Sequence, residues 1–328
     1  MRHTAASLFS WALEGVMNLP ERPMRWAQRR LGPGLAWLFV GPNLLVFSLF
    51  TFLPIILNAW YAATSGTNLL PGERPWVGLG NMQALLECGS YLDPSSCQRD
   101  LFWHGVHNTV AFVGLQVSLM VLFSGVTALA LNKPIAGRGF FRAAFFYPVL
   151  LSPVVVALIW KWILQRNGVL NAAIQAGGGQ PVDWLLGAGS AFGWTVFVSI
   201  WAHMGFYTLI LLAGLQAIPR DVYEAAAMDA ARPWTRFRRI TLPLVMPSLL
   251  VVLVLSLIRA VQIFDEVFVL TGGGPGTATT YLVQFIYETG FAQQVREYGM
   301  ASAASLLLAA VLLVLTLLQL RATRRSNG

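Results

Sequence analysis

The sequence contains few charged residues, and this scarcity excludes most water-soluble folds. Only 11% of its 328 residues are Asp, Glu, Lys or Arg, whereas 56% are hydrophobic. An average soluble domain is about one-quarter charged, so this chain has too little polar surface to close a soluble globule of its length. The mean hydropathy of +0.62 instead indicates a protein surrounded by membrane lipid.

Motifs for catalysis are also missing. No P-loop sequence occurs. The glycine-rich run from Thr271 to Gly276 lacks the Gly-Lys-Ser/Thr ending of a P-loop and is typical of a turn. His104 and His107 are three positions apart and could share a metal ion, but their place at the start of an apolar stretch favours a wetted interfacial pair. We therefore predict no enzyme activity, no metal and no cofactor for this chain.

The excess of basic residues does not indicate a nucleic-acid-binding protein. The formal net charge of +8 is spread over several loops and forms no single patch with interleaved aromatic residues. No period of about 20 to 50 residues recurs, and no long biased linker divides the sequence. We expect one membrane domain and no nucleic acid partner.

Six apolar stretches are long enough to cross a bilayer, which requires roughly 20 residues in a helix. All six should be helices, because lipid leaves the backbone of an open strand without hydrogen-bond partners. Prolines in the first, third and fifth stretches are expected to kink them. The predicted fold class is all-α, a polytopic membrane protein with spans Leu35 to Tyr61, Asn108 to Leu131, Ala143 to Trp160, Ala191 to Ile218, Leu244 to Phe264 and Gly299 to Leu320.

The basic residues predict the orientation of these spans in the cell membrane. With both termini in the cytosol, most of the 22 Lys and Arg residues fall on the cytosolic side, as the positive-inside rule requires. Residues 1–30 would then be a cytosolic segment, either an interfacial amphipathic helix or a disordered basic tail. Residues 31–320 would be the transmembrane domain, with a cytosolic loop at 219–243, and residues 321–328 a basic cytoplasmic tail.

Both cysteines, Cys88 and Cys97, lie in the first external loop under this orientation. An oxidising compartment outside the membrane would favour a disulfide between them, and two free thiols are the alternative.

The fifth span is unusually polar near its outer end. Arg259, Gln262 and Glu266 are spaced i, i+3 and i+7 on one helical face, with Asp265 beside them. An arginine at that depth costs about 2.5 kcal/mol or more on insertion scales, so this face should look toward water or a partner. We predict that these four residues line a pathway for a polar solute; the alternative is a structural ion pair between helices. His203 in the fourth span is either a packed histidine or part of the same pathway.

The cytosolic loop between the fourth and fifth spans carries the most informative pattern. Asp221 and Glu224 would occupy the first turn of a short helix, whose N-terminus favours negative charge, and the alanines that follow have high helix propensity. The helix should end near residues 229–232, because Pro233 is typical of the first turn of a second short helix. Small side chains would allow a partner to approach closely; the alternative is a loop that rests on lipid headgroups.

A motif in this loop consists of Glu224, Ala225, Ala226, Asp229, Ala231, Phe237, Ile240, Leu242, Pro243 and Pro247. It resembles the cytoplasmic coupling loop of permease subunits in bacterial ATP-binding-cassette importers, the inner membrane components of binding-protein-dependent transport systems. Phe264-Asp265 and the segment from Val269 to Pro275 are similar to the carbohydrate-uptake branch, in particular to the first maltose or glycerol-3-phosphate permease subunit. The likeness extends from the first span to the sixth.

The resemblance implies a permease that docks on a cytoplasmic ATPase subunit through a coupling helix. Leu242 and Pro243 would join this helix to the fifth span, and a second permease subunit and an extracytoplasmic solute-binding protein would complete the importer. The solute would be a sugar, an oligosaccharide or a sugar-like molecule, and ATP hydrolysis would take place on the partner. The implied docking residues are Glu224, Ala225, Ala226, Asp229, Ala230 and Ala231.

Two points remain open at the level of sequence. The family usually has glycine where this chain has Ala230, and a positive φ at an alanine would cost about 1 kcal/mol. The alternative function is an ion-coupled secondary transporter acting alone, which would need intramembrane carboxylates. Only Asp265 and Glu266 approach that requirement.

Overall fold

The structure is a computed structural model that describes Trp37 and residues 39–326. The chain divides into two compact units, Met1–Asn58 and Ala59–Gly328, and each is described by itself. The expectations for residues 1–30, an interfacial helix or a basic tail, lie outside the described residues.

A long apolar helix includes residues Phe39–Ala62, and most of these residues belong to the first unit. Its middle is the π-helical segment η1 (Ser48–Phe52), and its last part is α3 (Leu53–Ala62). The wide π turn comes directly before Pro54, whose ring would clash with the carbonyl four residues earlier in a regular α-helix. The helix thus accommodates a proline without being interrupted.

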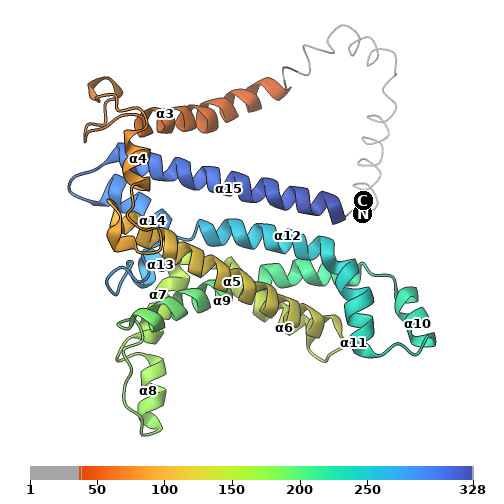
Figure 1. The fold of residues 1–328 in the computed structure, drawn as a ribbon. Helices are drawn as coiled ribbons and strands as arrows, with labels where there is room; N and C mark the ends of the chain where they lie inside the picture. Colours follow the sequence, from red (N-terminus) through yellow and green to blue (C-terminus); the bar gives the residue numbers. More distant parts are fainter. Residues whose placement is uncertain (1–36, 38, 327–328) are drawn as a thin grey trace, which may run out of the picture. The chain divides into compact units, whose positions relative to one another are not determined.

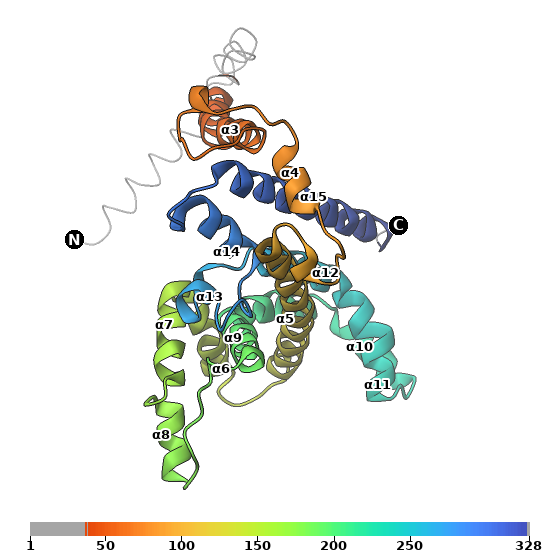
Figure 2. The ribbon, with the colours of Figure 1, turned by 60° about the vertical axis from the view of Figure 1, so that its left-hand side comes forward.

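The second unit is helical, and among its described residues β-type pairing is limited to the isolated bridges Thr64–Trp76 and Cys88–Cys97. Helices α5, α9, α12 and α15 are the long ones, and Figures 1 and 2 show them running side by side. The helices are α4 (Gly80–Leu86), α5 (Asp100–Asn132), α6 (Arg138–Phe146), α7 (Pro153–Leu164), α8 (Val169–Ala176), α9 (Ala188–Gln216), α10 (Arg220–Met228), α11 (Pro233–Arg236), α12 (Leu242–Val261), α13 (Asp265–Leu270), α14 (Leu282–Tyr287) and α15 (Tyr298–Ser326). Shorter 3-10 and π segments are η2 (Pro71–Glu73), η3 (Pro94–Ser96), η4 (Tyr147–Leu150), η5 (Phe237–Thr241) and η6 (Glu288–Ala292).

The main core lies where α5, α9 and α12 meet. Phe112 and Met120 of α5 pack there with Leu211 of α9 and Val252 of α12, and all four are almost completely buried. Polar groups in this core bond to the backbone of their own helix, as the hydroxyl of Ser124 does with the carbonyl of Met120 at 2.6 Å. Such internal bonds remove the cost of placing a hydroxyl in an apolar environment.

Five helices of the described residues are long and apolar enough to cross a membrane. They correspond to the first, second, fourth, fifth and sixth predicted spans, and the all-α fold class is confirmed. The five are Phe39–Ala62, Asp100–Asn132, Ala188–Gln216, Pro233–Val261 and Tyr298–Gln319.

The prediction of one helix over the third span, residues 143–160, is wrong. Helix α6 continues into η4 and stops there, and the helical stretch that begins at Pro153 is inclined to it by 102°. Ser152 adopts an extended backbone with φ −60° and ψ 140°, as residues before proline generally do, and Pro153 then fits the first position of α7. A count of six spans therefore holds only if this bent pair is one span.

The external loop predicted before the second span is tied down by covalent and polar contacts. The structure joins Cys88 and Cys97 in a disulfide. Arg74 is buried and donates to the hydroxyl of Thr64 at 2.8 Å and to the carbonyl of Gly66 at 2.9 Å. Farther along, Arg99 forms an ion pair with Glu297 at 2.9 Å, which links the start of α5 to the start of α15.

Gly205 in the middle of α9 allows α9 to lie very close to the end of α6. A Cβ atom at this position would be 2.1 Å from the carbonyl oxygen of Phe145 and 2.9 Å from the Cα of Phe146. These neighbours are backbone atoms, so no side-chain rotation can make room.

We predict that Gly205→Ala destabilises the protein, because overpacking of this kind costs about 1–3 kcal/mol. The measurement is the unfolding temperature of the purified full chain in detergent. Gly193→Ala in the same helix is the matched control, since nothing lies within 4 Å of its added Cβ and alanine favours a helix by up to about 1 kcal/mol. Equal unfolding temperatures for the two variants would contradict the close approach.

Candidate functional site

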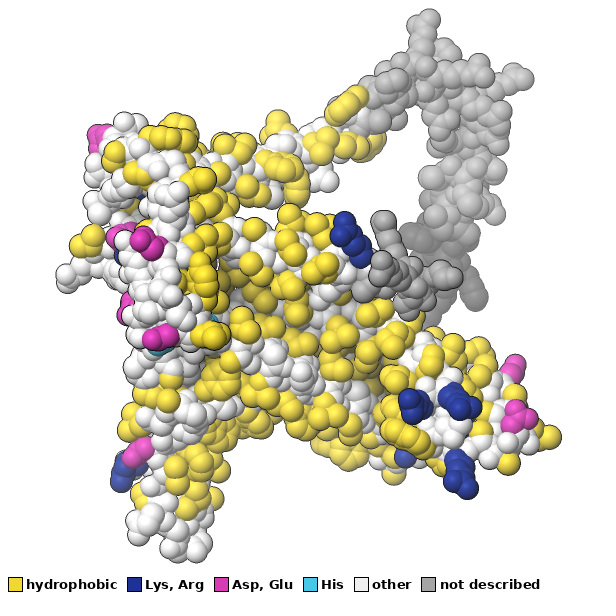
Figure 3. All heavy atoms as spheres, viewed as in Figure 1, with side chains coloured by type: hydrophobic (Ala, Val, Ile, Leu, Met, Phe, Trp, Pro, Cys, Tyr) yellow, Lys and Arg dark blue, Asp and Glu magenta, His cyan; other side chains and the backbone are white. Residues whose placement is uncertain are grey.

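Helix α10 forms the first part of the loop that resembles a coupling segment. It begins after Pro219, and Asp221 lies in its first turn as predicted from charge, whereas the same prediction for Glu224 is wrong because Glu224 is the fifth residue of the helix. Glu224 and Ala225 are exposed, whereas Ala226 is only 7% exposed and faces the protein itself. Figure 3 shows magenta carboxylate side chains at the end of the molecule where α10 lies. The outward face of α10 therefore combines carboxylates with small side chains.

The chain turns sharply after α10 at Ala230, which has a φ of +51°. The amide of Ala230 donates to the carbonyl of Ala227, and the amide of Ala231 donates to the carbonyl of Ala226, both at 3.0 Å. This pair of bonds is the Schellman arrangement that ends many helices, and its left-handed residue is usually glycine. The turn is thus made with an alanine that carries a strain of about 1–2 kcal/mol.

The part of the loop after this turn is not a separate short helix, so that element of the sequence prediction is wrong. Segments α11, η5 and α12 form one continuous helix, Pro233–Val261, of 29 residues. In η5 the amide of Leu242 donates to the carbonyl of Phe237. Since Pro243 has no amide to donate, the π turn before it relieves the clash that the ring would cause. Leu242 and Pro243 therefore lie inside the long helix.

A hydrogen bond ties α10 to the base of this long helix. The hydroxyl of Tyr223 lies 3.0 Å from the hydroxyl of Thr241, and Thr241 is 8% exposed. The ring of Tyr223 packs against the main core. Helix α10 is consequently held to the long helix both by the short turn at its end and by a contact along its side.

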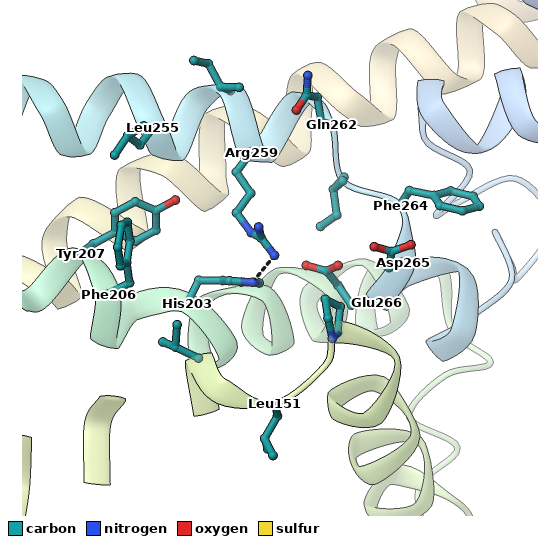
Figure 4. Close-up of a pocket in the computed structure, with 14 residues that line it drawn as sticks. Leu151, His203, Phe206, Tyr207, Leu255, Arg259, Gln262, Phe264, Asp265 and Glu266 are labelled. Carbon is teal, nitrogen blue, oxygen red and sulfur yellow. Dashed lines mark hydrogen bonds between the residues drawn. The ribbon is translucent and has the colours of Figure 1, made fainter. Parts of the chain in front are cut away.

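A cavity of about 690 Å³ lies at the opposite end of the long helix. All four residues predicted for a polar pathway line it, namely Arg259, Gln262, Asp265 and Glu266. Figure 4 shows Arg259 and Glu266 directed toward His203 of α9, with Phe206 and Tyr207 also on α9, whereas the Gln262 side chain points away from them. The aromatic pair beside His203 was not predicted as part of the site, although its position next to an intramembrane histidine could have indicated it.

These four residues come together for a reason other than the one the spacing suggested. They do not share a helical face, because α12 ends at Val261 and Phe264 has a non-helical φ of −151°. The chain turns there and starts a new helix, α13, at Asp265. The turn, and not helical periodicity, brings Glu266 back to the cavity that Arg259 lines.

His203 positions the guanidinium group of Arg259. The Nδ1 atom of His203 lies 2.9 Å from the carbonyl oxygen of Ser199, and a carbonyl can only accept, so Nδ1 carries the proton. The other ring nitrogen, Nε2, is then free to accept a hydrogen bond from Nη2 of Arg259, as the dashed line in Figure 4 marks. Arg259 makes no ion pair with Asp265 or Glu266, both of which the structure describes.

Long apolar helices around a cavity that contains a few charged and polar side chains, with a short exposed helix at the far end of one of them, are typical of a membrane permease. Residues 110–327 match the family of binding-protein-dependent transport system inner membrane components. The chain belongs to this family. The identification from sequence of an importer permease of the carbohydrate-uptake type is thereby confirmed, and an ion-coupled transporter acting alone is not favoured.

Relatives and solved structures agree with this family. The chain is 38% identical over 293 residues to the trehalose/maltose transport system permease protein MalF of Thermococcus litoralis, covering 88% of this chain and 94% of that protein. It is 31% identical over 293 residues to the lactose transport system permease protein LacF of Rhizobium radiobacter, covering 88% and 93%. Its fold matches a chain of a bacterial ABC transporter involved in the import of the acidic polysaccharide alginate, with a TM-score of 0.76, 25% identity and coverage of 93% and 99%.

We predict that Ala230→Gly raises the stability of the protein by up to about 1 kcal/mol, because glycine adopts a positive φ without the steric cost that alanine carries. The measurement is again the unfolding temperature of the purified chain. Ala227→Gly, three positions earlier inside α10, is the matched control and should lower stability by about 1 kcal/mol. The prediction fails if both glycine variants are destabilised to the same extent.

Proposed function

We propose that this chain forms half of the translocation pathway of an ATP-driven importer and is moved by a separate cytoplasmic ATPase subunit. The observation that carries the proposal is the continuous helix Pro233–Val261. The helix begins directly after the turn that follows α10, and Arg259 near its other end lines the cavity. At 1.5 Å per residue, a rigid helix of this kind connects the two sites over about 40 Å. A displacement of α10 would therefore reach the cavity directly.

In this proposal, α10 and the turn after it dock on the ATPase. Glu224, Ala225 and Asp229 are exposed, and Ala230 and Ala231 form the turn, so these five residues would make the contacts. Ala226 has a different role, because its side chain is buried against the protein itself. Its small size would let α10 lie close to its own bundle. Leu242 and Pro243 would transmit the movement as part of the long helix.

The cavity suits a solute that is rich in hydroxyl groups. Arg259, Gln262 and Glu266 offer donors and acceptors, while Phe206 and Tyr207 offer ring faces against which a sugar can lie. The trehalose/maltose and lactose permeases among the relatives support a sugar, an oligosaccharide or a sugar-like solute. A second permease subunit would complete the pathway, and the family's dependence on binding proteins supports delivery of the solute by an extracytoplasmic receptor.

The proposed orientation places both termini in the cytosol. Figure 3 shows dark blue Lys and Arg side chains gathered at the α10–α11 end, with an apolar surface between this end and the external loops. The positive-inside rule assigns such a basic end to the cytosol. The proposed organisation is a cytosolic segment at residues 1–30, a permease domain at 31–320 that includes the coupling loop 219–243, and a basic tail at 321–328.

Co-expression of this chain with its ATPase subunit and second permease subunit tests whether α10 couples ATP hydrolysis to transport. We predict that Glu224→Lys lowers ATP-dependent uptake into vesicles at least about tenfold, because a reversed charge at a docking surface costs several kcal/mol. The variant should still insert in the membrane, and less ATPase should co-purify with it. Glu73→Lys, an exposed glutamate at the other end of the second unit, is the control and should transport normally. Full uptake by Glu224→Lys, or uptake by the chain alone with an ion gradient, would refute the proposal.

A second prediction concerns the cavity. Arg259→Ala should lower solute uptake about tenfold or more without loss of assembly, since a hydrogen bond to a charged group contributes about 1.5–3 kcal/mol. Uptake rate and apparent solute affinity should be measured together in reconstituted vesicles. Arg166→Ala is the control, because Arg166 pairs with Asp183 at 2.6 Å outside the cavity. An unchanged rate and affinity for Arg259→Ala would assign Arg259 a purely structural role.

A further inference from the structure

Two arginines at the start of α6 converge on one uncharged atom. The side-chain oxygen of Gln216, at the end of α9, accepts hydrogen bonds from Nη2 of Arg138 and from Nη2 of Arg142, each at 2.7 Å. The two guanidinium groups are four residues apart on one face of α6. Two full positive charges thus share one amide oxygen, which carries no charge of its own.

The described residues provide no counter-charge for this pair. Neither Arg138 nor Arg142 forms an ion pair with a described carboxylate. The Nε atoms of both arginines are buried and have no hydrogen-bond partner. The C-terminal end of α9, where Gln216 lies, contributes only about half a negative charge through its dipole. The site therefore keeps a net positive charge that a bound anion would neutralise.

The surroundings of the pair indicate where such an anion would come from. Helix α6 is short and amphipathic, and Phe140, on the side opposite the arginines, is 73% exposed. Phe141 is 44% and Tyr147 61% exposed. In a membrane protein such apolar side chains contact lipid, and α6 precedes a stretch that enters the membrane, so the arginines lie at the level of the headgroups.

We propose that the phosphate of an anionic phospholipid binds between Arg138 and Arg142 beside Gln216. Because both Nε atoms are buried and both Nη2 atoms donate to Gln216, the phosphate is held by charge-assisted hydrogen bonds from the remaining terminal N–H groups of the two guanidinium groups. Under the orientation proposed above, this site faces the cytosolic leaflet, where anionic lipids provide the negative surface. The lipid tails lie along the exposed aromatic side of α6. Bound lipid fastens α6 to α9 at the cytosolic end of the bundle.

Replacement of the shared oxygen by a carboxylate tests this site without removing either arginine. Gln216→Glu has the same shape and supplies an internal counter-ion, so it competes with the lipid phosphate. Gln175→Glu adds the same charge at an exposed position on α8 and is the matched control. Binding is measured on the purified full chain by native mass spectrometry, in titrations with phosphatidylglycerol and, separately, with phosphatidylcholine.

The expected result is that the unmodified chain binds phosphatidylglycerol at least about tenfold more tightly than phosphatidylcholine. Gln216→Glu should lose that preference at least about tenfold while its unfolding temperature stays the same or rises, and Gln175→Glu should keep it. Arg142→Gln provides a second test with the same expected loss. An unchanged preference in Gln216→Glu, or equal binding of the two lipids by the unmodified chain, would overturn the proposal.

A soluble phosphate ion shares the chemistry of the headgroup and is distinguished by competition. Inorganic phosphate at millimolar concentration should displace little phosphatidylglycerol, because the tails add apolar contacts with the Phe140 side of α6. Complete displacement by inorganic phosphate would show that the arginines bind a soluble anion and would overturn the lipid assignment.

Discussion

Lipid offers the backbone no hydrogen-bond partners, so each spanning helix of this permease must satisfy its amides and carbonyls internally. The prolines of the chain conflict with this requirement, and the structure resolves the conflict in three ways. Pro54 and Pro243 each follow a π-helical segment that makes room for the ring. Pro153 starts a new helix after a sharp break, and Pro247 is tolerated inside α12. Where a π segment precedes the proline, the helix stays continuous. In the helix Pro233–Val261 this continuity connects the turn after α10 with the cavity.

Local conflicts are also resolved at the two ends of the long helix Pro233–Val261. At one end, a turn that favours glycine is made with Ala230 at a positive φ, and a contact between Tyr223 and Thr241 at 3.0 Å holds α10 in place. At the other end, α12 stops at Val261 and the chain folds back into α13. Arg259, which would be costly in lipid, thereby lines the cavity together with other polar side chains. His203 orients Arg259 by a hydrogen bond whose acceptor is a neutral imidazole nitrogen.

Much of this arrangement could be predicted from the sequence, because long apolar runs and helix-ending residues are local signals. The spans around α5, α9 and α15 follow from hydropathy, and the short helix α10 follows from alanine propensity and from Asp221 in its first turn. The 102° break at Ser152 and Pro153 could not, since a proline in an apolar run is compatible with either a kink or a full break. The cavity residues were found for an incomplete reason: the spacing of Arg259 and Glu266 suggested one helical face, but the turn that joins them depends on packing between α12, α13 and α9.

The π segment Phe237–Thr241 has a further consequence for the long helix. Its wide turn holds one more residue than an α-helical turn, so every later side chain is rotated by about 100° relative to an uninterrupted α-helix. The direction in which Arg259 points is thus set some five turns upstream, at the cytosolic base of the helix. Because the ring of Pro243 would clash with a regular α-helical turn at this place, the sequence favours the π geometry, and with it the direction of Arg259. A single proline next to the proposed docking site thus helps to set the side of α12 that Arg259 presents to the cavity about five turns away.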